Sequence, residues 1–274
     1  QAGRDQDIRG VADRRPGEDA PFNVRVFVDG NFALRAATYQ HAQTAGDVDE
    51  PPGAQGANYG SGRLFNVAVA PMIGAVFKIE DFALGAAFYV PFGGASSWSK
   101  NAAFEGNNQF PGAVDGVQRW ASIDGVLRSS YISFAAAYDI AKYVSVGASF
   151  NLVMSQVQTV RARTVPGIND IDSEGRSLID VSGMHGAFGV GGLAEPIPGK
   201  LWIGASYQSQ PGLGEMQLTG TLRNNFGGAL SEDPVKLFQS LPDVVRFGVR
   251  GRPTDDTELR LFGDVTAWGR FDKQ

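Results

Sequence analysis

Residues 22–39 read FNVRVFVDGNFALRAATY, and this stretch decides the fold of the chain. Side chains alternate between the two faces of a β-strand, so even and odd positions form separate faces. Every even position from 22 to 36 is apolar or glycine, whereas the odd positions include Arg25, Asp29 and Arg35. A strand of a soluble sandwich needs about 5–6 residues, and one that crosses a membrane about 9–11. The continuous apolar face therefore predicts a transmembrane strand.

The same alternation returns along the chain and predicts an all-β fold, an antiparallel transmembrane β-barrel. In residues 82–92, for example, the even positions from Phe82 to Phe92 share one apolar face. Nine strands are predicted, at 22–39, 64–79, 82–92, 127–140, 143–163, 177–194, 200–222, 242–252 and 257–271.

The predicted connections alternate in length. Those at 80–81, 141–142, 196–199 and 253–256 are short, and those at 41–63, 93–125, 164–176 and 223–241 are long. Short turns on one side and long loops on the other are typical of outer-membrane barrels, with the long loops outside the cell. Residues 210–214, QPGLG, are interpreted as a bulge or bend inside one long strand, because a turn there would break the alternation.

Two units are expected: an amino-terminal periplasmic segment at 1–21, and the barrel at 22–274. The first and ninth strands run in the same direction, but bacterial single-chain barrels close with an even number of strands. Either the barrel continues past residue 274 or the strand count is wrong by one.

Composition agrees with a strand-rich chain and excludes several classes of site. Glycine makes up 36 of 274 residues, about 13% against an average near 7%, which disfavours a helical protein. With no cysteine, the chain has no disulfide scaffold, thiolate metal site or cysteine nucleophile. His41 and His185 are far apart in sequence, so a histidine metal cluster is not expected. A net charge of −5 argues against nucleic acid as a partner.

Enzyme motifs are weak or missing, so no catalytic residue, cofactor or metal is predicted. Residues 189–194, GVGGLA, fit a dinucleotide fingerprint, but Pro196 and Pro198 exclude the helix that would bind pyrophosphate. There is no Gly-x-Ser-x-Gly or Walker motif. Loop acids could bind calcium weakly, although solvated carboxylates are the favoured interpretation; they are Asp47, Asp49 and Glu50, and Asp170, Asp172 and Glu174.

Several hairpins resemble those of one family in order and spacing. Residues 70–93, which end in Pro91-Phe92-Gly93, are similar to the hairpin in that family that ends in proline-phenylalanine-glycine. The series continues at 137–150, 203–209, 241–248 and 263–268. On these residues the chain resembles the FadL-type outer-membrane transporters of long-chain fatty acids and other hydrophobic compounds, the OmpP/FadL/TodX group.

The resemblance implies a fourteen-stranded barrel, of which about nine strands are visible here, in the bacterial outer membrane. It also implies an amino-terminal hatch with an Asn-Pro-Ala element, but residues 1–21 contain no such element. In the family a kinked third strand opens the wall laterally. Pro91, Phe92 and Gly93 match that kink, because proline donates no ladder hydrogen bond and glycine suits a bulge. A plain strand end would explain the same residues.

The odd face of the first strand and matching positions near the carboxy terminus are predicted to line the lumen. In the last hairpin, a turn near residue 255 would place Arg246 roughly opposite Asp264. A basic lumen could attract a carboxylate; the alternative is a solvated or mutually paired interior. The lumen-lining candidates are Arg25, Asp29, Arg35, Arg246, Arg250, Glu258, Arg260 and Asp264.

The long loop at 93–125 carries four aromatic residues in polar surroundings. In the family, external loops capture the ligand, so these are candidates for first contact. The alternative is that they pack the loop onto itself or anchor it at the membrane interface. They are Trp98, Phe104, Phe110 and Trp120.

The expected function is passive uptake of a hydrophobic ligand, such as a long-chain fatty acid, through an outer-membrane channel that is not an enzyme. Its partners would be that hydrophobic small molecule and outer-membrane lipid. The alternative is a FadL-like barrel that serves as a structural or docking partner in an envelope or secretion assembly, with a protein partner.

Overall fold

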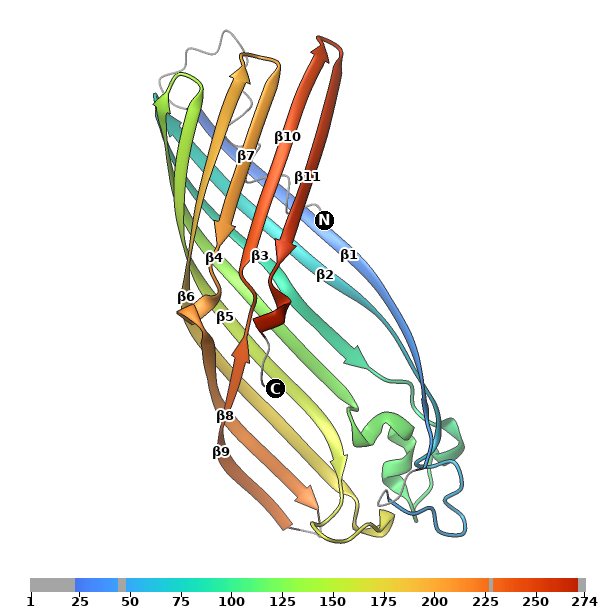
Figure 1. Ribbon diagram of the computed structural model, residues 1–274. Coiled ribbons are helices and arrows are strands. Elements are labelled where there is room, and N and C mark those ends of the chain that lie inside the picture. The colour runs from blue at the N-terminus through green and yellow to red at the C-terminus, as the bar shows by residue number, and fades with distance from the viewer. Residues whose placement is uncertain (1–22, 44–47, 227–228, 271–274) are drawn as a thin grey trace.

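The computed structural model describes residues 23–43, 48–226 and 229–270. Eleven β-strands form one antiparallel sheet that curls around a central space (Figure 1). The strands are β1 (Asn23–His41), β2 (Gly60–Ile79), β3 (Phe82–Ser97), β4 (Asp124–Ala141), β5 (Val144–Arg163), β6 (Gly175–Ile197), β7 (Leu201–Gln208), β8 (Glu215–Phe226), β9 (Ala229–Ser240), β10 (Val244–Thr254) and β11 (Thr257–Thr266). The antiparallel all-β prediction is confirmed.

The wall of the sheet follows the order β1-β2-β3-β4-β5-β6-β7-β10-β11, and β8 pairs with β6 and β9. Among the described residues, no strand pairs with the outer edge of β1 or of β11, so the curled sheet is open there. None of the described helices is long and apolar enough to span a membrane. The predicted amino-terminal segment at 1–21 lies outside the described residues.

The predicted strand at 200–222 is bent, as expected. Its two halves, β7 and β8, are separated by the short 3-10 helix η6 (Pro211–Leu213), and both pair with β6. The predicted long loop at 223–241 is wrong, because residues 223–226 and 229–240 belong to β8 and β9, which pair with each other. The last predicted strand is also shorter than 257–271: β11 ends at Thr266, and the 3-10 helix η7 (Trp268–Arg270) follows.

The connections sort to two ends of the sheet. Those between β2 and β3, β4 and β5, β6 and β7, and β10 and β11 lie at the end shown at the top of Figure 1, here called the short-turn end. The described parts of the long connections after β1, β3 and β5 lie together at the opposite end, here called the loop end, and contain the 3-10 helices η2 to η5. This is the arrangement that the loop lengths predicted.

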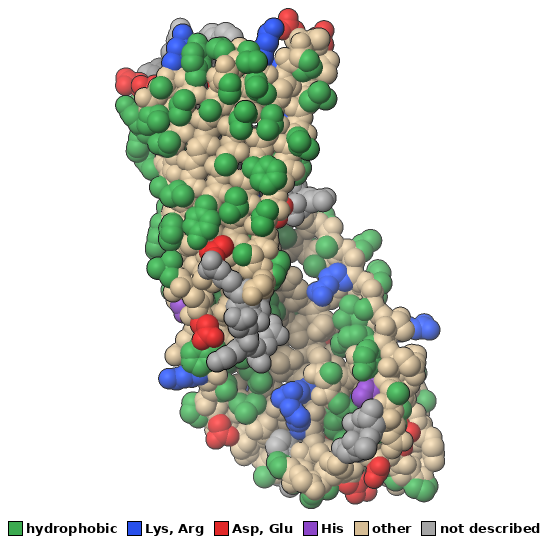
Figure 2. Space-filling view, in the orientation of Figure 1, with side chains coloured by type: hydrophobic (Ala, Val, Ile, Leu, Met, Phe, Trp, Pro, Cys, Tyr) green, Lys and Arg blue, Asp and Glu red, His purple; other side chains and the backbone are tan. Residues whose placement is uncertain are grey.

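The outward face of the wall is apolar toward the short-turn end, where hydrophobic side chains gather in Figure 2. On β1, Val28 and Phe32 are 74% and 75% exposed, as lipid-facing side chains are when the bilayer is absent. On β5 and β6 this apolar band ends at the paired Met154 and Met184.

Beyond Met154 and Met184 the outward face of the wall becomes polar and the inward face becomes apolar. The next outward pair across β5 and β6 is polar, Gln156 and Ser182. On β8 the apolar Met216 and Leu218 point inward and are fully buried. Because polar side chains face outward here, this part of the wall extends beyond the apolar band toward the loop end.

Candidate functional site

A cavity of about 480 Å³ lies inside the curl of the sheet. Strands β1 to β7, β10 and β11 all contribute to its lining. On β4, β5 and β6 the inward side chains are small, and they leave the space between opposite walls unfilled. These small residues are Ala135, Ala137, Gly147, Ser149, Gly189 and Gly191. Three of the glycines, Gly147, Gly189 and Gly191, therefore help to keep the interior open.

Two of the predicted lumen charges line this cavity. Arg246 and Asp264 stand directly opposite each other across β10 and β11, as predicted. The Nη1 atom of Arg246 donates a hydrogen bond to Gln208 Oε1 at 3.0 Å, and Thr266 Oγ1 donates to Asp264 Oδ2 at 3.2 Å. The lumen charge is thus a matched pair with polar neighbours and not a bare cation.

The remaining predicted lumen residues on β10 and β11 meet at the short-turn end, away from the cavity. Glu258 accepts hydrogen bonds from Arg250 at 2.7 Å, from Arg252 at 2.9 Å, and from Arg260. The Arg250 guanidinium also stacks on the ring of Trp202, 4.6 Å from its centroid. Sequence analysis missed Arg252 and Trp202 as members of this cluster.

On β1, alternation places the three predicted residues on the inward face. Phe27 and Asn31, which share that face, line the cavity, but Arg25, Asp29 and Arg35 do not. The Asp29 carboxylate accepts a hydrogen bond from the amide of Gly30 at 2.7 Å.

Strand β3 carries a β-bulge at the predicted kink. Tyr89 pairs with Tyr131 of β4, and the next paired residue, Phe92, stands opposite Ser129, so β3 has one more residue than β4 in this interval. The extra residue reverses the alternation of faces. Phe92 therefore points into the lumen, and its predicted place on the outward face with Phe82 is wrong.

The bulge creates an aromatic cluster at the edge of the cavity. The rings of Tyr89 and Tyr131 stack with centroids 5.2 Å apart, and Phe92 packs against Tyr131 at 6.4 Å. Trp268, from the opposite edge of the wall, meets Phe92 edge to face at 5.9 Å. Tyr131 is only 1% exposed and joins a buried core with Val153 and Met216. The sequence signal that could have identified Tyr131 is a single tyrosine among the small residues at the inward positions of β4.

The bulge also separates β3 from β2. These strands pair from Ile79↔Phe82 to Met72↔Tyr89, and the next contact is an isolated bridge between Leu64 and Trp98. Between these two contacts, residues 65–71 of β2 and 90–97 of β3 form no ladder. We call this interval the wall window. It adjoins the cavity, which Pro71, Val90 and Pro91 line.

The described parts of the three long connections, 42–43 with 48–59, 98–123 and 164–174, pack together at the loop end and are here called the cap. Phe104 and Phe110 are 5% and 3% exposed and pack in its core against alanines and Ile171. Trp98 and Trp120 are half-buried. The structure therefore separates the four predicted capture residues into two that form the core of the cap and two that remain partly accessible.

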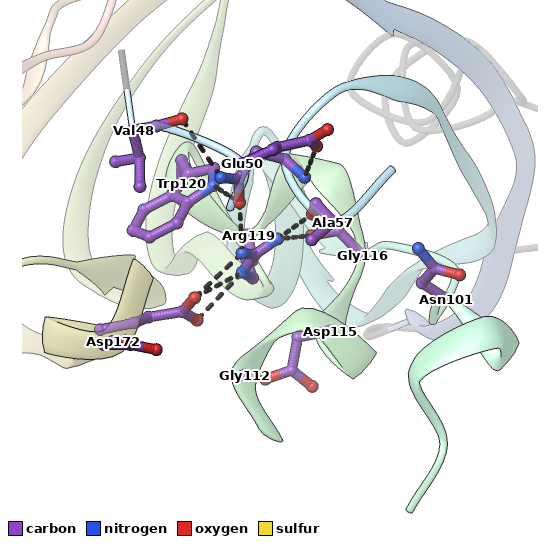
Figure 3. Close-up of polar contacts among 12 residues, drawn as sticks. Val48, Glu50, Ala57, Asn101, Gly112, Asp115, Gly116, Arg119, Trp120 and Asp172 are labelled. Carbon is purple, nitrogen blue, oxygen red and sulfur yellow. Dashed lines mark hydrogen bonds and ion pairs between the residues drawn. The ribbon is translucent and has the colours of Figure 1, made fainter. Parts of the chain in front are cut away.

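A fully buried guanidinium, that of Arg119, joins the three connections (Figure 3). Its Nε and Nη2 atoms donate to the Glu174 carboxylate at 2.9–3.0 Å, and its Nη1 atom donates to the carbonyls of Ala57 and Gly116. Asn58 accepts from Arg119 Nη2 and from the indole nitrogen of Trp120. Nothing in the sequence distinguishes Arg119 from a solvated loop arginine.

Two of the loop acids considered for calcium, Glu50 and Glu174, bind groups within the cap, and Asp47 lies outside the described residues. The Glu50 carboxylate accepts three backbone N–H groups, those of Gly56, Asn58 and Tyr59, at 2.6–3.1 Å. Glu174 pairs with Arg119 and with Arg176. Across the described ranges, no group of three or more acidic or histidine side chains is placed to hold a metal ion.

The chain matches known proteins of the same architecture. The family model described as outer membrane protein transport protein (OMPP1/FadL/TodX) matches residues 26–274. The chain belongs to this family. The family consists of outer-membrane β-barrel proteins, so the predicted location in the outer membrane is confirmed along with the resemblance. No curated protein sequence matches the chain.

Solved structures of OMPP1/FadL/TodX proteins share the fold at low sequence identity. A FadL homologue of Pseudomonas aeruginosa gives a TM-score of 0.66 at 15% identity, covering 91% of this chain and 60% of its own. The toluene transporters TodX of Pseudomonas putida and TbuX of Ralstonia pickettii give 0.58 at 13% and 0.53 at 17%, each covering 89% of this chain and 61% of theirs. The chain thus spans about 60% of the length of these relatives.

Proposed function

We propose that the chain forms part of an outer-membrane channel through which a small hydrophobic compound passes without covalent chemistry. The observation that carries this proposal is the cavity of about 480 Å³ between small inward side chains and an aromatic edge. Pockets for small molecules have volumes of about 300–1,000 Å³ and are mostly apolar with a few polar groups. This cavity has both properties.

The charges inside the cavity favour a neutral ligand. A carboxylate near Arg246 would also approach Asp264, which stands directly opposite it in the β10–β11 register. Like charges repel, so the attraction of the arginine for an anion is offset. The TodX and TbuX structures are described as those of toluene transporters, and a neutral aromatic hydrocarbon of that size is our first candidate. A long-chain fatty acid is the second, because Arg246 could still bind its head group.

The cap supplies a route to the cavity in this proposal. Trp98 and Trp120 are accessible enough to meet a ligand first, whereas a ligand can reach Phe104 and Phe110 only if the core of the cap opens. In this proposal the wall window between β2 and β3 serves as a lateral exit from the cavity.

Filling the cavity tests the proposal. Ala135 points inward on β4, so Ala135→Phe should occupy part of the cavity and weaken the binding of toluene by roughly tenfold or more, the effect of about 1.4 kcal/mol. Ile132→Phe, on the outward face of the same strand, is the matched control. Binding is measured on purified protein in detergent, with oleate as a second probe and mass spectrometry of co-purified lipids.

The two ligand candidates predict different results. Saturable toluene binding that only Ala135→Phe weakens supports a neutral ligand, and the same pattern with oleate alone supports a fatty acid. If neither probe binds and a protein co-purifies instead, the channel proposal fails and a docking role replaces it.

A further inference from the structure

One row of paired residues on the outward face marks the change from the apolar band to the polar part of the wall. The row lies directly beyond the apolar pair Met154 and Met184, toward the loop end. It crosses five strands, from β4 to β9, and contains a cation at each end and no acid. Its members are Arg128, Gln156, Ser182, Thr219 and Lys236.

A third cation holds the equivalent place on β2. Phe65 is the last apolar side chain on the outward face of that strand and is 71% exposed, and Arg63 is the next outward residue toward the loop end. All three basic side chains are exposed, and none forms a side-chain hydrogen bond or an ion pair with another described residue. We call Arg63, Arg128 and Lys236 the basic rim.

Acidic residues on the same face lie farther from the apolar band. On β4 and β9 the nearest outward acids, Asp124 and Glu232, lie four residues beyond the basic rim, about 13 Å along a strand. Glu232 is already paired with Arg223. Asp180 of β6 lies two residues beyond the row and accepts a hydrogen bond from Gln158 at 3.4 Å. Charge on this face is therefore sorted by height, with cations alone next to the apolar band.

The height of the basic rim is the height at which a bilayer presents its phosphate groups. Basic residues immediately beside a membrane-spanning segment attract anionic head groups. The stem of Arg128 lies along the wall, with its Cγ 3.7 Å from the position that a Cβ on Gly93 would occupy. Such a side chain covers the wall with its stem and carries its charge into the head-group layer.

The cations of the basic rim are too far apart to share one phosphate. Arg128 and Lys236 are separated by four strand spacings of about 4.8 Å each, roughly 19 Å in all. Each cation therefore has room for a lipid of its own.

We propose that the basic rim binds anionic phospholipid head groups, one at each cation, around the loop end of the apolar band. The partner is a lipid in the bilayer and not free phosphate, because the three cations follow the boundary of the apolar band. This inference does not depend on what the cavity holds, since none of the three residues lines it.

Lipid titration of the purified protein in detergent, followed by native mass spectrometry, tests the basic rim. The probe is phosphatidic acid, and phosphatidylcholine with the same acyl chains is the neutral comparison. Arg128→Gln and Lys236→Gln should each weaken the binding of phosphatidic acid by roughly fivefold, the effect of one basic residue at an anionic surface, and leave phosphatidylcholine unchanged. Arg223→Gln is the matched control, because Arg223 is an outward arginine farther from the band that is already paired.

An added cation tests the same inference without removing any side chain of the basic rim. Ser182 is exposed in the middle of the row, so Ser182→Lys should strengthen the binding of phosphatidic acid by a similar factor. Thr221→Lys is the control, because Thr221 stands directly opposite Asp180, which would neutralise the new charge.

The outcomes separate this inference from the proposed function. Weaker binding in the rim variants and stronger binding in Ser182→Lys, with both controls unchanged, support it. The basic rim is refuted if the unchanged protein does not prefer phosphatidic acid, or if Arg223→Gln weakens binding as much as the rim variants do. Toluene binding should be the same in every variant, so either proposal can fail while the other stands.

Discussion

Burial distinguishes residues that look alike in the sequence. Arg119 and Arg223 are both arginines outside the apolar band, and each forms an ion pair with a glutamate. The side chain of Arg119 is fully buried with Glu174, whereas those of Arg223 and Glu232 are 53% and 52% exposed. A broken buried pair leaves a charge without water, but an exposed pair is replaced by hydration.

Arg119→Met should therefore lower the free energy of unfolding of the cap by about 3 kcal/mol, the lower end of the range for a broken buried pair, because Arg176 still contacts Glu174. Arg223→Met should cost less than about 1 kcal/mol. Hydrogen exchange of the amides in 98–123 measures the difference. Equal protection in the two variants would contradict the role assigned to Arg119.

Sequence separation explains which residue contacts could be predicted. Arg246 and Asp264 belong to one hairpin, so the position of a short turn was enough to place them opposite each other. Arg119 and Glu174 are 55 residues apart and belong to different connections, which no strand register relates. Pairing between loops depends on how the whole cap folds, and a local pattern contains no signal for it.

At the scale of elements, the alternation of apolar and polar residues located the strands that face lipid. It missed β9, which does not face lipid. Strands β1 to β6 lie close to their predicted ranges because a lipid-facing strand needs a continuous apolar face. Strand β9 contains Glu232, Asp233, Pro234 and Lys236, and it lies beyond the apolar band, so it was interpreted as a loop. The bulge in β3 was predicted from Pro91 and Gly93, but its effect on the direction of Phe92 depends on residue count, which only the β4 register shows.

Residue count also predicts how the bulge can be removed. Deleting Pro91 should restore equal numbers of residues in β3 and β4 and let β3 continue its ladder with β2. Each added hydrogen bond stabilises the closed wall by about 0.5–1.5 kcal/mol, so the release of bound toluene from purified protein in detergent should slow by roughly tenfold or more. Exchange protection of the amides in 65–71 should rise in parallel.

Pro91→Ala is the control for this deletion, because it keeps the residue count and therefore the bulge. If the alanine variant closes the window as the deletion does, the ring of proline and not the extra residue is responsible.

At the scale of the whole molecule, the apolar band fixes the position of the wall in the membrane. The band and the polar rows beyond it lie on the same strands, so one strand crosses from lipid to water along its length. On β5 this change occurs between Phe150, which is 51% exposed on the outward face, and Gln156. The sequence predicted the band, but it did not show how far the strands extend past it.

A single charge placed at two heights tests this position. Phe150→Arg should destabilise the protein in lipid vesicles by about 2–4 kcal/mol, the cost of an arginine near the midplane, whereas Gln156→Arg should cost about 0–1 kcal/mol. Urea titration of the protein folded into vesicles measures both. Equal costs would mean that the band does not mark the bilayer.

The buried guanidinium at the centre of the cap has a consequence for recognition by antibodies. Because Arg119 binds groups from all three connections, the surface above it is assembled from segments that are distant in sequence. An antibody that binds this surface would recognise a discontinuous epitope. No peptide copied from one loop would compete for that antibody, and denaturation would abolish its binding.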